Sequence, residues 1–145
     1  MLSITKGKSG GRGRGSISFD EAEIEESLSV AFPGYTQYIP NGHNVPSPCA
    51  SGKHIWKGVG HDIAHGGGPR NLFGLDFASS AHVWTRDLCM ADSDLDGVSN
   101  GVELGDPTCS WSVGETPEGQ ATGHPGICEP MNDPKCQSVN VNVVC

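Results

Sequence analysis

Six cysteines lie between residues 49 and 145 of this chain, and no two of them form a Cys-x-x-Cys pair. A structural zinc site usually needs such short paired spacings, so zinc is the weaker interpretation of the cysteines. An even number of widely spaced cysteines is instead typical of small extracellular domains, in which disulfides compensate for a limited hydrophobic core. We therefore expect three disulfides and an oxidising, extracellular compartment. The cysteines are Cys49, Cys89, Cys109, Cys128, Cys136 and Cys145.

The glycine and proline content of the chain limits how much regular secondary structure it can form. The chain has 145 residues, of which 35% are hydrophobic, and it contains 21 glycines and 10 prolines. Glycine loosens the backbone and proline removes a hydrogen-bond donor, so long helices and broad sheets are disfavoured. The sequence predicts a small disulfide-rich, loop-rich domain with a few short helices, minimal β structure, and one helix leading into a calcium-type loop.

The net charge restricts the partners of such a domain. The formal charge is −8, whereas phosphate binding requires a cationic face. Nucleic acid and anionic membrane surfaces are therefore improbable partners, and cations are the natural ligands. The chain also lacks an apolar stretch long enough for membrane insertion.

Three regions follow from changes in composition. Residues 1–31 are expected to be an atypical leader, disordered over the Gly- and Arg-rich start, with a short acidic helix from Ser18 to Leu28. This region lacks the apolar run of about 7 to 15 residues found in a secretory signal. Residues 32–136 are expected to form the folded domain, and residues 137–145 a C-terminal tail or a short edge strand.

One segment carries a clear helical period. Phe77, Ala81, Trp84 and Leu88 recur at steps of three and four residues between Asp76 and Met90. The pattern predicts a single helix over that segment, capped by Asp76 or Ser79 and packed through Trp84.

The segment that follows has the spacing of a calcium loop. Calcium takes about 6 to 8 oxygen ligands, which alternating carboxylates can supply around a tight turn, and a glycine at the sixth position allows the bend. Twelve-residue loops of this type also use the carbonyl of the seventh residue and a bidentate glutamate at the end. The sequence therefore predicts a lone structural calcium site, with no second loop to pair with it. The predicted ligands are Asp92, Asp94, Asp96, the Val98 carbonyl, Asn100 and Glu103.

Two cysteines flank this loop. A disulfide between Cys89 and Cys109 would clamp its two ends, and by the chain-entropy argument a closed loop of this size contributes roughly 3 kcal/mol. We therefore favour this pairing.

Many further motifs, taken in order, resemble one family. The calcium loop itself is similar to thrombospondin type 3 repeats, but the ordered set over about Phe32 to Cys136 closely resembles the temptin family. The motifs are Pro33-Gly34-Tyr35, Ile39-Pro40-Asn41-Gly42, Val45-Pro46-x-Pro48-Cys49, Trp56-x-Gly58-Val59-Gly60-His61, Asn71-x-Phe73-Gly74-Leu75-Asp76-Phe77, Val83-Trp84-Thr85, Glu103-Leu104-Gly105-Asp106-Pro107 and His124-Pro125-Gly126-x-Cys128-Glu129-Pro130.

The resemblance implies a secreted molluscan water-borne protein pheromone, which acts with other pheromone peptides on a receptor that the sequence does not identify. It also implies that Cys49 pairs with Cys128 or Cys136, and Cys89 with Cys109. Cys145 departs from the family pattern and is expected to pair with Cys136 or to stay free and link chains.

Other chemistry has weaker support in the sequence. His54, His61 and His65 would suit zinc or copper if the backbone around them were helical, but the surrounding glycines disfavour a helix. No His-Glu-x-x-His or Gly-x-Ser-x-Gly pattern supports an enzyme. We therefore expect a signalling protein and not an enzyme, with an extracellular matrix or adhesion protein as the alternative and a copper-dependent oxidative role third.

Overall fold

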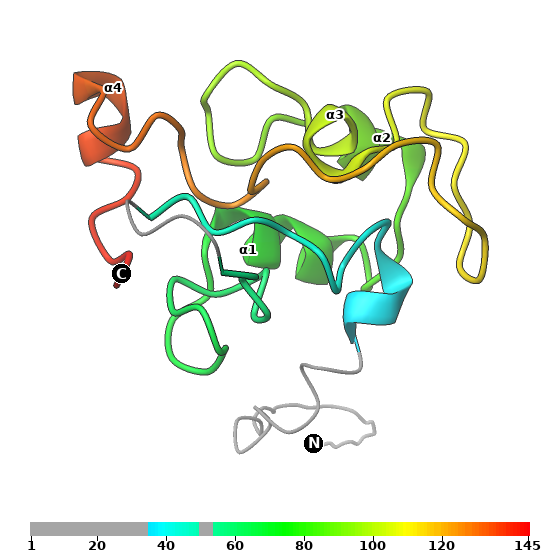
Figure 1. The fold of residues 1–145 in the computed structure, drawn as a ribbon, viewed down its shortest axis with the longest axis horizontal. Helices are drawn as coiled ribbons and strands as arrows, with labels where there is room; N and C mark the ends of the chain where they lie inside the picture. The colour runs from blue at the N-terminus through cyan, green and yellow to red at the C-terminus, as the bar shows by residue number, and fades with distance from the viewer. Residues whose placement is uncertain (1–34, 50–53) are drawn as a thin grey trace. The chain divides into compact units, whose positions relative to one another are not determined.

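Besides a 3₁₀ turn over residues 35–38, the helical structure of residues 35–49 and 54–145, the part of the chain that the computed structural model describes, consists of four short α-helices (Figure 1). They are α1 (Leu72–Ser79), α2 (Arg86–Met90), α3 (Asn100–Leu104) and α4 (Pro134–Gln137). All of them belong to one unit, Pro33–Cys145, and the leader and acidic helix expected before it lie outside the described residues. In the described residues β pairing consists of three isolated bridges, so the expected loop-rich fold with few short helices is confirmed.

The continuous helix predicted from Asp76 to Met90 is wrong, because two helices with a break between them occupy this region. Asn71 caps α1 by accepting a hydrogen bond from the Gly74 N–H, and Thr85 caps α2 by accepting one from Leu88. Between the helices, Ala81 and His82 adopt left-handed φ angles of 58° and 59°. This conformation costs an L-residue roughly 1–2 kcal/mol, so it is not expected at an alanine or a histidine from residue type alone.

Aromatic packing offsets the strain at this break. The His82 ring stacks on Tyr35 with a centroid distance of 4.2 Å and meets Phe77 edge-on at 5.1 Å. The backbone N–H of His82 also donates to the Phe77 carbonyl. The break is therefore stabilised both by local contacts with Phe77 and by the stacking on Tyr35, which is far away in the sequence.

The hydrophobic interior consists of two small clusters. The larger one contains Ile39, Val45, Val59, Phe73, Phe77, Leu88 and Leu104, with Tyr35 and Trp84 packed against it. Trp84 therefore packs against the core, but from the break between α1 and α2 and not from a helix as predicted. The smaller cluster consists of Cys49, Trp56 and Ile127, with Ala64, Met131 and Val143 at its edge.

Asparagine side chains supply long-range hydrogen bonds that a sheet would otherwise supply. Asn71 donates to the carbonyls of Val59 and His61, and Asn41 donates to those of Leu104 and Gly119. Asn140 both accepts from the Cys128 N–H and donates to the Cys128 carbonyl. An amide side chain has both a donor and an acceptor, so it can pair with backbone much as a neighbouring strand does.

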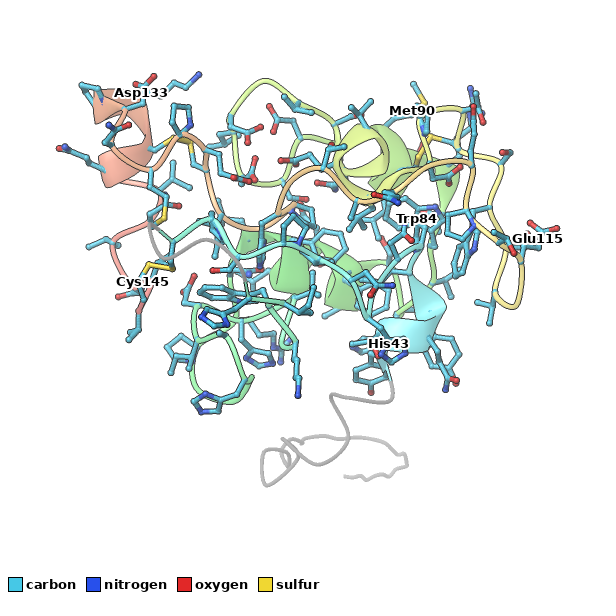
Figure 2. All side chains as sticks on the ribbon, viewed as in Figure 1. His43, Trp84, Met90, Glu115, Asp133 and Cys145 are labelled. Carbon is cyan, nitrogen blue, oxygen red and sulfur yellow. A yellow bond between two sulfur atoms is a disulfide. The ribbon has the colours of Figure 1, made fainter. Side chains whose placement is uncertain are left out.

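Three disulfides connect the described loops, and the pairing is only partly as expected. The Cys89–Cys109 bond is confirmed. The pairing expected for Cys49 is wrong, because Cys49 bonds to Cys145, whose sulfur lies near the C-terminus in Figure 2. Cys128 bonds to Cys136, so Cys145 is neither free nor paired with Cys136.

The last residues are held to the rest of the unit by more than this disulfide. Val144 forms a parallel bridge with Ile63 and donates its N–H to the Asp62 carbonyl. The surrounding residues form turns instead of a continuous strand. Within the described ranges, the helices are all too short or too polar to cross a membrane.

Candidate metal centre

The acidic loop joins α2 to α3, two helices that pack against each other (Figure 1). Its tight turn depends on two left-handed residues, Leu95 with φ of 62° and Gly97 with φ of 92°. Asp92 accepts hydrogen bonds from the N–H groups of Asp96 and Gly97. These contacts fold the loop back on its first carboxylate.

Three carboxylates converge inside this turn. Ligand oxygens of Asp92, Asp94 and Asp96 all lie within 4.8 Å of one another, and no other such group of three exists among the described residues. Two oxygens bound to one calcium ion at about 2.4 Å each are at most about 4.8 Å apart, so the spacing suits a single ion.

Two buried carboxylate oxygens in this region lack a hydrogen-bond partner. Asp94 is fully buried and its Oδ2 is unpaired, while Glu103 is 3% exposed and its Oε1 is unpaired. An unpaired buried polar atom costs about 1–3 kcal/mol, and more when it is charged. The metal-free arrangement is therefore unfavourable unless a proton or a cation satisfies these oxygens.

Burial also changes the pKa values of Asp94 and Glu103. Burial raises the pKa of Asp94 to about 10, and repulsion from Asp96 adds to the shift. Burial likewise raises the pKa of Glu103 to about 10, with repulsion from Asp94 and Asp96 as the next causes. Nearby carboxylates disfavour each other's ionised form, and a divalent cation reverses this effect.

Glu103 reaches the site from α3 and not from the loop itself. Ser99 caps this helix by accepting a hydrogen bond from Val102, and Gly105 ends it in a left-handed conformation. The helix that follows the loop is therefore short and ends before Pro107. Glu103 lies outside the group of three converging aspartates, but its unpaired oxygen and its repulsion by them place it beside that group.

Asn100, one of the predicted ligands, is hydrogen-bonded through both ends of its amide. Its Oδ1 accepts from the Ser93 N–H, and its Nδ2 donates to the Leu88 carbonyl and to Ser93 Oγ. This fully buried amide thus joins the beginning of the loop to α2. Val98 lies in the turn beside the carboxylates, and its N–H donates to Asp96 Oδ1.

A further carboxylate, Glu129, approaches this region from the C-terminal segment. Its pKa is raised mainly by burial, with repulsion from Asp96 as a smaller cause, and its Oε1 accepts from the His124 N–H at 2.9 Å. Sequence reasoning missed it because it is remote from the loop, and the Cys128-Glu129-Pro130 motif gives no ligand spacing.

His124 lies five residues before Glu129 and is fully buried. Its Nδ1 accepts from the Gly126 N–H, and its ring meets Trp56 edge-on at a centroid distance of 5.2 Å. Burial lowers its pKa to about 3, so the ring is neutral at physiological pH. Its Nε2 has no hydrogen-bond partner.

The histidines considered for zinc or copper do not form a ligand group in the described residues. His61 is buried and its Nδ1 contacts the Gly68 carbonyl at 3.3 Å, whereas His54 and His65 are exposed. Their segment has no helix that would align them.

Comparison with known proteins gives one family. The family model described as Temptin C-terminal matches residues 29–127. Temptin of Aplysia californica is 53% identical over 104 residues, which cover 71% of this chain and 82% of that protein. No solved structure matches the chain.

Proposed function

The chain belongs to the temptin family, and we propose that it is a secreted, water-borne attractant pheromone component whose fold is stabilised by disulfides and one calcium ion. The observation that carries this proposal is the identity with the Aplysia californica protein over most of both chains. The family resemblance implies a signal that acts together with other pheromone peptides on a receptor, so the protein is proposed to be a messenger and not an enzyme.

The disulfides support release into an extracellular medium. All cysteines of the chain are paired, and one bond joins residues 96 positions apart in the sequence. Such cross-links persist in oxidising compartments and restrict the unfolded chain. The fold of the protein outside the cell therefore does not depend on its two small hydrophobic clusters alone.

Calcium is the cation that the donor set fits best. The candidate ligands are carboxylate oxygens, which hard cations prefer, and the three converging aspartates have the spacing of ligands on one ion. The unpaired oxygens of Asp94 and Glu103 support the same assignment, because a bound cation would satisfy both. We propose Asp92, Asp94, Asp96, the Val98 carbonyl and Glu103 as ligands, and we leave out Asn100 because its amide is already hydrogen-bonded.

An attraction assay tests the proposed signal. Recombinant oxidised protein is added to the water upstream of animals of the source species, alone and with their other pheromone peptides. The mixture is expected to attract more animals than the peptides alone, and protein with its disulfides reduced and alkylated is expected to add nothing. Recovery of the native protein only from an insoluble secretion, with no effect in the assay, would favour a matrix or adhesion protein instead.

A further inference from the structure

Glu103 and Glu129 both lie close to one small residue, Gly123. A Cβ atom built on Gly123 would be 3.0 Å from Glu103 Oε2 and 3.3 Å from Glu129 Oε1. The two carboxylates therefore approach the same point from α3 and from the C-terminal segment. A larger residue at position 123 would force them apart.

Backbone contacts hold this segment against α3. The N–H groups of Thr122 and Gly123 both donate to the Glu103 carbonyl, at 2.8 and 3.3 Å. The His124 N–H donates to Glu129 Oε1 at 2.9 Å, which fixes one oxygen of that carboxylate. The approach of Glu129 to Glu103 is thus built into the packing of two segments far apart in the sequence.

Two carboxylates this close to each other need a positive charge or a shared proton. The positive charge of Lys135 lies in this region. Its Nζ contacts the backbone carbonyl of Asp96, at 3.5 Å, and not a carboxylate oxygen. Glu103 keeps a buried oxygen without a hydrogen-bond partner, and its carboxylate is close enough to Asp94 and Asp96 to be repelled by both. A divalent ion held by the three converging aspartates would face Glu103 and reduce the repulsion between Glu103 and Glu129.

We propose that Glu129 contributes its negative charge to the calcium site, so that a single ion joins the acidic loop to the C-terminal segment. This inference rests on the calcium binding proposed above. The segment also carries the Cys128–Cys136 disulfide, and through Asn140 it is tied to the chain end that Cys145 anchors. Calcium therefore orders the C-terminal segment as well as the loop.

The test compares isosteric variants of two glutamates. Glu129→Gln removes the charge but keeps an oxygen to accept the His124 N–H, and Glu118→Gln makes the same change at an exposed carboxylate. Calcium affinity of the oxidised, full-length proteins is measured by titration calorimetry, with Asp94→Asn as the variant that disables the loop. Affinity rises with the number of charged ligands, so Glu129→Gln is expected to bind about tenfold more weakly, and Glu118→Gln as tightly as the unmodified protein.

A second readout follows the C-terminal segment directly. Calcium is expected to slow amide hydrogen exchange over residues 122–130 in the unmodified protein, and to slow it less in Glu129→Gln. Unchanged affinity in Glu129→Gln, together with loss of binding in Asp94→Asn, would overturn the role of Glu129 and leave the calcium site intact. No binding by the unmodified protein would overturn both. If Glu129→Gln fails to fold, the unmodified protein alone provides the test. The inference would then be overturned if calcium did not change its amide hydrogen exchange over residues 122–130.

Discussion

Trp84 donates its indole N–H to Asp106 Oδ2 over 2.8 Å, which connects the turn before α2 to the segment after α3. The other oxygen of this fully buried carboxylate accepts from the N–H groups of Ser110 and Trp111. Asp106 thus satisfies three donors from two places in the chain, Trp84 and the adjacent Ser110 and Trp111. The helix pair that carries the acidic loop depends on this carboxylate for its alignment.

Replacing Asp106 with asparagine should therefore destabilise the protein. The new amide group has one acceptor oxygen instead of two, so at least one buried donor loses its partner, at a cost of about 1–3 kcal/mol. Chemical denaturation of Asp106→Asn, Trp84→Phe and the double variant measures the coupling between the two side chains. Strictly additive effects in this cycle would show that the hydrogen bond contributes nothing of its own.

The disulfide pairing predicts unequal costs for removing different bonds. Cys49 and Cys145 are 96 residues apart, and replacing both with serine should cost about 4–5 kcal/mol by the chain-entropy argument. Cys128 and Cys136 are only 8 residues apart, and their replacement should cost about 2–3 kcal/mol. Peptide mapping without reduction should recover both pairs from the unmodified protein. A peptide linking Cys49 to Cys128 would contradict the pairing.

The buried carboxylates predict a pH dependence that appears only without metal. The pKa values of Asp94 and Glu103 in the folded protein are raised to about 10, above those of the unfolded chain. The folded state then retains protons that the unfolded state loses, so stability falls as pH rises between the two values. In chelator, the free energy of unfolding should fall from pH 7 to pH 8.5 by on the order of 1 kcal/mol per pH unit.

Two comparisons check the origin of that slope. Saturating calcium should remove it, because the carboxylates are then ionised in the folded state as well. The variant that combines Asp94→Asn with Glu103→Gln should also show no slope in chelator. The same slope in this variant and in the unmodified protein would assign it to other groups.

His124 predicts the opposite effect in acid. Burial lowers its pKa in the folded protein to about 3, so below about pH 6.5 the unfolded chain binds a proton that the folded state excludes. Stability from this group is lost as pH falls. His124→Asn retains an acceptor for the Gly126 N–H but has no titrating ring. The free energy of unfolding of the unmodified protein minus that of His124→Asn should decrease by about 1.4 kcal/mol per pH unit as the pH falls from 6 to 4.5. A constant difference would contradict the lowered pKa.

The sequence was informative where the chemistry is local. The acidic loop depends on residue spacing within one turn, and the loop's flanking cysteines, Cys89 and Cys109, needed only a short reach to pair. The end of α3 is also local, because Gly105 directly after Leu104 adopts the left-handed conformation that commonly ends a helix. In each of these cases neighbouring residues decide the conformation.

The sequence was misleading where remote contacts decide. The break between α1 and α2 depends on His82 stacking against Tyr35, and no neighbour of His82 signals it. The bond from Cys49 to Cys145 and the approach of Glu129 to Glu103 both depend on how distant loops pack. Residue spacing carries no information on such packing.

Thermal unfolding of the oxidised protein, with and without calcium, tests most directly whether a divalent ion completes a fold held by cross-links. A ligand that binds only the folded state at about 100 times its dissociation constant adds roughly 2.7 kcal/mol. The unmodified protein is expected to melt at a higher temperature in calcium, whereas the melting temperature of Asp94→Asn is expected not to change. Identical melting of the unmodified protein in calcium and in chelator would contradict this expectation.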